Sequence, residues 1–201
     1  MHDSESQATV KKDSRPLRVP TPLADIQKVI PQAMSVPVEP QPSSSLIATA
    51  YHEAGHAVIA LALGRAVQRV SILPGHAWLG RCEFQKGRVR PSEDWLEREI
   101  LISLAGAAAE ARHTGAYAWD GAIADLRTVR RLAVQRASER QAARLERRLL
   151  AKVEHLLDQA GHWQAVELIA VELLCCETIS GRAVRHLFDQ GSKQADASTG
   201  P

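Results

Sequence analysis

The sequence predicts a mostly helical α+β domain with a small antiparallel β element. Long segments with apolar residues at helical spacing follow one another from residue 46 to residue 190. One pair of shorter segments, within residues 67–84, has the composition of strands instead. Hydrophobic residues make up 45% of the chain and charged residues 24%, so the chain can bury a globular core.

The first predicted helix covers residues 46–63 and stops at Gly64, because glycine is common just after a helix end. Its second half, from Ala57 to Leu63, is continuously apolar, which is typical of a buried helix. Gly55 lies in the middle of this helix. Our hypothesis is that its missing side chain lets another backbone approach closely.

A pair of strands is predicted directly after this helix. Residues 67–73 and 77–84 have strand-like composition, and Pro74-Gly75 between them is a turn signal. We expect this pair to lie beside the first helix. An edge strand at that place can hold an extended polypeptide by strand addition.

The rest of the domain is predicted to be helical. The expected helices cover residues 92–113, 122–159 with a break near Ser138, 162–176 and 182–190. Residues 105–109 are all small, so we expect this part of its helix to pack tightly against helix 46–63. Residues 177–180 are predicted to be a short connection, and Cys175 and Cys176 to be small core residues.

The two ends of the chain are predicted to lie outside the domain, which leaves residues 46–190 as the folded unit. Residues 1–45 hold seven of the ten prolines and are predicted to be a disordered tail. Residues 191–201 are predicted to be a polar tail. No apolar run approaches the roughly 20 residues that cross a membrane, and no signal-peptide core follows Met1, so we expect a cytoplasmic location without membrane contact.

Residues 52–56 form a His-Glu-x-x-His pattern inside the first predicted helix. Residues four apart lie on one face of a helix, so His52 and His56 can aim their imidazoles at one point. A catalytic zinc takes three protein ligands, and a helix that is buried must find partners for such polar groups. We therefore predict a zinc site with His52 and His56 as ligands. Glu53 is placed to act as the general base toward an attacking water.

A third ligand must come from another part of the chain, and the residues alone leave several candidates. Asp125 lies one turn into its predicted helix, so its carboxylate can point to one side. Glu110 follows the small residues that should pack near the zinc helix, and it too can reach the site. Asp120 sits in a turn, where it can cap the next helix instead, and His76 sits in the turn between the strands.

Four segments in this order resemble the protease domain of the FtsH-type ATP-dependent zinc metalloproteases. They are AYHEAGHA at residues 50–57, VSILP at 70–74 with LG at 79–80, LAGAAAE at 104–110 with GAIADL at 121–126, and LLCCETISG at 173–181. The resemblance covers roughly residues 47–190. It implies peptide-bond hydrolysis, Glu53 as catalytic base, and His52, His56 and Asp125 as zinc ligands, since the family's third ligand lies in a similar Gly-Ala-x-x-Asp-Leu stretch.

Members of that family carry an ATPase module, and usually a membrane anchor, before this domain. The sequence contains no Gly-x-x-x-x-Gly-Lys-Ser/Thr phosphate loop. We therefore expect cleavage of short or unfolded polypeptides without a motor in this chain, with a separate ATPase and a homo-oligomer as candidate partners. The alternative is a metal-stabilised binding or adaptor module whose peptidase activity is weak or lost.

Eight arginines lie between Arg127 and Arg148, where Glu139 and Glu146 are the only acidic residues. The whole chain carries a net charge of only +2, and no recognised nucleic-acid motif accompanies the arginines. We therefore interpret the cluster as a solvated helix surface or a subunit contact, and we do not expect a nucleic-acid partner.

Overall fold

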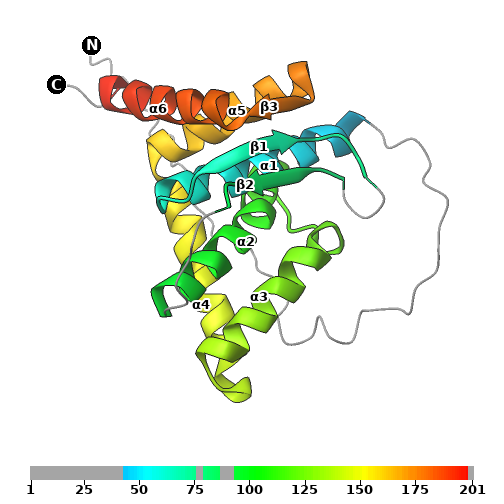
Figure 1. The fold of residues 1–201 in the computed structure, drawn as a ribbon, viewed down its shortest axis with the longest axis vertical. Helices are drawn as coiled ribbons and strands as arrows, with labels where there is room; N and C mark the ends of the chain where they lie inside the picture. The colour runs from blue at the N-terminus through cyan, green and yellow to red at the C-terminus, as the bar shows by residue number, and fades with distance from the viewer. Residues whose placement is uncertain (1–42, 76–78, 87–92, 199–201) are drawn as a thin grey trace, which may run out of the picture.

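The computed structural model describes residues 43–75, 79–86 and 93–198. The predicted fold class is confirmed, because helices dominate and one small antiparallel sheet lies against α1 (Figure 1). The described elements are α1 (Ser43–Ala62), β1 (Val67–Ser71), β2 (Arg81–Phe84), α2 (Glu93–Thr114), the 3-10 helix η2 (Trp119–Ala122), α3 (Ile123–Arg136), α4 (Glu139–Asp158), α5 (Ala160–Cys176), β3 (Thr178–Ser180) and α6 (Gly181–Ser198).

The sheet has three strands in the order β2-β1-β3, so β2 forms one edge. In the centre, Val70 pairs with Cys82 of β2 on one side and with Ile179 of β3 on the other. The sequence predicted the strand pair β1–β2. The prediction for residues 177–180 is wrong, because a short connection was expected there and residues 178–180 form strand β3. Three residues are too few for a sequence pattern, and β3 forms only because β1, more than 100 residues earlier, offers a free edge.

Helices α1 and α2 pack closely through small residues, as predicted. A Cβ atom built on Gly55 would lie 2.5 Å from the carbonyl oxygen of Ala105 and 2.5 Å from the Cβ of Ala109. Helix α1 ends at Ala62, and the stop predicted at Gly64 follows two residues later, where a φ of 75° favours glycine. The expected contact between the zinc-motif helix and residues 105–109 is therefore present.

The predicted break in the long helical segment is also present. Helix α3 ends at Arg136, Ala137 and Ser138 have extended backbones, and α4 begins at Glu139. The amide of Ala142 donates to the carbonyl of Ser138, which starts the new helix. As a result, α3 and α4 form an antiparallel pair that makes one end of the molecule (Figure 1).

The last helix is longer than predicted. It continues through Gln190 to Ser198, so the polar tail expected at residues 191–201 is wrong for the part that the structure describes. Gly191 is buried against α5, and a Cβ there would lie 2.6 Å from the amide nitrogen of Ala165. The lack of a side chain at Gly191 allows α5 and α6 to touch here.

The neighbouring helix α5 corrects a second expectation. Cys175 and Cys176 are exposed rather than part of the core, because α5 buries the face that carries Val166, Ile169 and Leu173. None of the described helices combines the length and the apolar character needed to cross a membrane. The tail predicted at residues 1–45 is wrong for residues 43–45, which form the start of α1, and residues 1–42 lie outside the described residues.

Candidate metal centre

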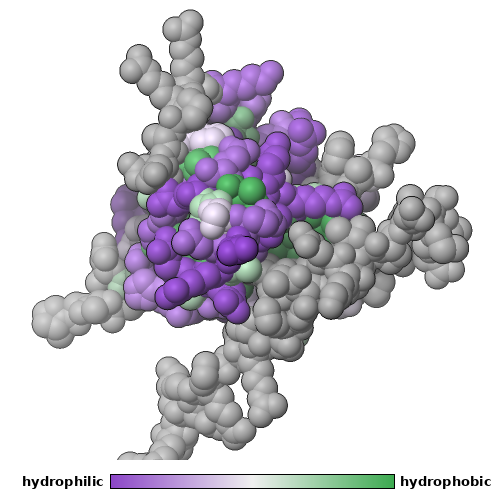
Figure 2. Space-filling model, turned by 90° about the horizontal axis from the view of Figure 1, so that it is seen from below, coloured by the Kyte–Doolittle hydropathy of each residue, from purple (hydrophilic) through white to green (hydrophobic). Residues whose placement is uncertain are grey.

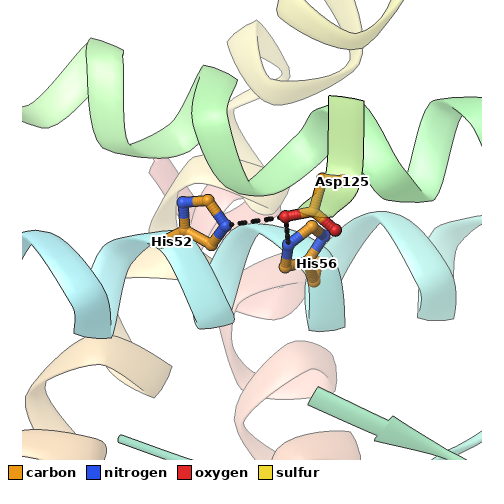
Figure 3. A group of neighbouring side chains, drawn as sticks. All are labelled: His52, His56 and Asp125. Carbon is orange, nitrogen blue, oxygen red and sulfur yellow. Dashed lines mark hydrogen bonds and ion pairs between the residues drawn. The ribbon is translucent and has the colours of Figure 1, made fainter. Parts of the chain in front are cut away.

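Two helices bring three side chains together at the centre of the domain. His52 and His56 project from one side of α1, and Asp125 reaches them from the first turn of α3 (Figure 3). The Oδ2 atom of Asp125 lies 3.3 Å from Nε2 of His52 and 3.4 Å from Nε2 of His56. One ligand atom from each residue lies within 4.8 Å of the others, so the three can hold a metal ion.

The backbone of α2 leaves room for an ion at this point. A Cβ atom on Gly106 would lie 2.4 Å from Nε2 of both His52 and His56, so any side chain there would fill the space between the ligand atoms. Two imidazole nitrogens and one carboxylate oxygen make up a ligand set that zinc accepts in catalytic sites. The residues therefore fit a divalent metal ion.

Helix α2 also orients both imidazoles, because its residues contact the Nδ1 atom of each ring. Nδ1 of His52 lies 2.9 Å from Oε2 of Glu110, and Nδ1 of His56 lies 2.7 Å from the carbonyl oxygen of Ile102. Because both partners are acceptors, each Nδ1 carries the proton and each Nε2 is directed toward the metal position.

Glu110 therefore contacts His52 through Nδ1, the ring nitrogen that faces away from Asp125. It does not belong to the three-residue group that could hold a metal ion. The sequence pattern suggested Glu110 only as a third ligand, and this orienting contact was not predicted. The signal was available, because Ile102, Gly106 and Glu110 are spaced four apart and share one face of α2. The other candidates do not join the site: Asp120 is exposed in η2, and His76 lies outside the described residues.

A cleft of about 400 Å³ opens over the three side chains. Helices α1, α2 and α3 and the start of strand β2 contribute to its walls. Its polar side includes Glu53, Glu110 and Arg81, and its apolar side includes Phe84 and Ile102. The cleft thus offers an ion site, a further carboxylate and space for an organic group.

Comparison with known protein families matches residues 42–140 to peptidase family M41. This segment belongs to peptidase family M41. No curated protein matches the chain. The matched segment contains the whole group of His52, His56 and Asp125 as well as Glu53 and Glu110. The FtsH-type resemblance seen in the sequence is thereby confirmed for residues 47–140, whereas its last stretch, residues 173–181, lies outside the match. The chain therefore carries a metallopeptidase domain.

In this M41 domain Glu53 lies on α1 next to the first histidine and is buried in the wall of the cleft. Burial raises the pKa of Glu53, although the neighbouring His56 and His52 act against this rise, as does the amide of Cys82, which donates to the carboxylate. A Cβ atom on Gly80 would lie 2.8 Å from Cγ of Glu53, so the chain entering β2 passes directly over this side chain. A carboxyl group with a raised pKa accepts a proton more readily than an exposed one.

Strong electrostatic interactions link the three side chains of the candidate metal site in this M41 domain. Burial by itself lowers the pKa of His52, but hydrogen bonds to Asp125 and Glu110 outweigh burial and raise this pKa to about 10. Burial by itself raises the pKa of Asp125, but His56 and His52 lower it below its usual range. The carboxylates of Glu53, Glu110 and Asp125 surround the two imidazoles and therefore favour a cation at this place. A metal ion must compete with protons for the imidazole nitrogens.

Proposed function

We propose that the chain is a zinc-dependent endopeptidase that hydrolyses short or unfolded polypeptides. The observation that carries this proposal is the placement of the buried Glu53 in the same cleft as the buried His52 and His56 and the partly buried Asp125. A site that only held a structural metal would not require a further carboxylate with a raised pKa beside it.

Each residue of the site then has a defined task. His52, His56 and Asp125 would hold zinc, which when bound supplies a Lewis acid for the scissile carbonyl. Glu53 would accept a proton from the attacking water and pass it to the leaving amine. Glu110 keeps the His52 imidazole in the orientation and tautomer that this arrangement needs.

The position of β2 supports an extended substrate. This strand is an edge of the described sheet, and Leu79, Gly80 and Arg81 at its start line the cleft. A polypeptide added beside β2 would use backbone hydrogen bonds, so it must already be extended and unfolded. We propose that such substrates are cleaved without ATP, and that a folded substrate would need a separate ATPase to unfold it.

The proposal is tested with casein as an unfolded substrate and with metal analysis of the full chain. The wild-type chain should bind about one zinc ion, because the three residues form one set of zinc ligands. It should cleave casein equally with and without ATP. Glu53→Gln should retain the zinc and lose hydrolysis by about 100-fold or more, because Glu53 acts on the water and does not hold the metal.

Two results would contradict the proposal. Loss of zinc in Glu53→Gln would show that this carboxylate is a ligand. A wild-type chain that binds zinc and casein without cleaving it would favour the metal-stabilised binding module.

A further inference from the structure

Charge is distributed unevenly along this chain. Residues 127–148 hold eight arginines and two glutamates, a net charge of +6. Since the whole chain carries +2, all other residues together carry −4. The positive charge is therefore concentrated on α3 and α4, which form one end of the molecule (Figure 1).

Two of these arginines have structural partners. Arg130 forms ion pairs with Glu139 and Glu146, and Arg136 lies 2.9 Å from a carboxylate oxygen of Glu97. The other six are exposed, and none forms an ion pair with any residue in the described part of the chain. These six, which we call the basic rows, are Arg127 and Arg131 on α3 and Arg140, Arg144, Arg147 and Arg148 on α4.

Helical spacing aligns the basic rows on the outside of the molecule. The four arginines of α4 follow one another at intervals of four, three and one residues, which places them on one face over about 12 Å. The opposite face of α4 is buried through Ala142, Leu145 and Leu149. The end of the molecule formed by α3 and α4 is largely hydrophilic when seen from below (Figure 2).

The basic rows begin on the helix that carries Asp125 of the candidate active site. Asp125, which lines the cleft, lies in the first turn of α3, and Arg127 is exposed two residues further along the same helix. Because residues two apart point to opposite sides of a helix, Arg127 and Arg131 lie on the side of α3 turned away from Asp125, and a substrate that leaves the cleft reaches them where it passes around α3.

We propose that the basic rows bind an acidic segment of the polypeptide substrate outside the cleft. This inference rests on the proposed peptidase function and names a class of substrate for it. Guanidinium groups bind carboxylates through paired hydrogen bonds. Arg140 and Arg144 are about 6 Å apart along the helix axis, and alternate residues of an extended chain are about 6.8 Å apart, so successive acidic side chains can pair with successive arginines.

An acidic polypeptide fits these surfaces better than a nucleic acid does. Residues 123–158, which form α3 and α4, contain no phenylalanine, tyrosine or tryptophan on which a base could stack.

The test measures binding separately from cleavage. The full chain with Glu53→Gln is titrated into a fluorescent peptide of ten glutamates and into the matching glutamine peptide, and anisotropy is recorded at low and high salt. The glutamate peptide should bind more tightly, and high salt should remove the difference. Changing the four arginines of α4 to glutamine in this chain should weaken its binding about tenfold.

The matched control changes Arg182 and Arg185, two exposed arginines on α6, to glutamine. This control should bind the glutamate peptide within about twofold of the parent chain. Circular dichroism and melting temperature confirm that each variant is folded; if the four-residue variant unfolds, Arg127→Gln with Arg131→Gln replaces it.

Cleavage supplies the second measurement. In the otherwise wild-type chain, the α4 variant should raise KM for a peptide with an acidic extension and leave KM for a glutamine-extended peptide unchanged.

Equal affinity for the two peptides, or an equal loss of affinity in the α6 control, would overturn the proposal. Tighter binding of a single-stranded oligonucleotide of equal charge would assign the basic rows to nucleic acid instead. Selective binding of the glutamate peptide without any cleavage would support the binding role of the basic rows and refute the peptidase function.

Discussion

Glu110 accepts a hydrogen bond from Nδ1 of His52 across a distance of 2.9 Å. The two residues lie on different helices, α2 and α1, and their side chains are almost fully buried. The contact turns Nε2 of His52 toward His56 and Asp125, so Glu110 orients one residue of the candidate metal site without itself joining the group of three.

Replacing Glu110 should therefore weaken metal binding by more than a packing change would. We expect Glu110→Ala to lower zinc affinity by about 10- to 100-fold, because the His52 imidazole loses its orientation and its preferred tautomer. Glu110→Gln is the matched control, since its amide oxygen can still accept the hydrogen bond. Chelator competition measures both. Unchanged affinity in Glu110→Ala would show that packing alone positions His52.

Asp125 is expected to be the third ligand. Asp125→Ala should lower zinc affinity by more than about 100-fold, which exceeds the usual effect of losing an orienting residue. Asp120→Ala serves as the control, because Asp120 is exposed in η2, close in sequence but outside the ligand group. The assignment fails if Asp120→Ala releases the metal and Asp125→Ala retains it.

Metal binding should require that residue 106 is glycine, because any side chain there would occupy the space for the metal ion. Gly106→Ala would place a Cβ atom 2.4 Å from Nε2 of both histidines, so we expect the purified variant to contain almost no zinc. Gly121→Ala is the control in the same cleft, because a Cβ there meets no atom within 4 Å. Metal content by elemental analysis checks both variants. A Gly106→Ala variant with full zinc content would mean that the metal does not lie between these nitrogens.

The contact between α5 and α6 can be tested through Gly191. Alanine in a helix usually stabilises relative to glycine, but at Gly191 its Cβ would lie 2.6 Å from the amide nitrogen of Ala165. We expect Gly191→Ala to destabilise the domain by about 1–3 kcal/mol through overpacking. Urea unfolding measures the change, with the exposed Lys193→Ala as control. Increased stability in Gly191→Ala would show that α6 does not pack on α5 beyond Gln190.

Local patterns predicted the parts of this protein that depend on neighbouring residues. The four-residue interval between His52 and His56 is one helical turn, so their common direction follows from helix geometry alone. The strand pair β1–β2 is close in sequence and joined by a turn signal, and the break near Ser138 is marked by residues that favour a helix start. Each of these was predicted correctly because few distant contacts are needed to form it.

Only the tertiary structure decided what depends on distant contacts. Without the family resemblance, Asp125, Asp120 and Glu110 were all available carboxylates, and the packing of α1 and α3 on α2 separated a candidate ligand from an orienting residue. Strand β3 forms because β1 offers an edge, and α6 continues past Gly191 because α5 accepts the helix backbone at short distance. The amino-acid sequence by itself determined the helices and the pair of histidines on α1. The identity of their partners came from packing, because residues far apart in the chain meet only when the whole core closes.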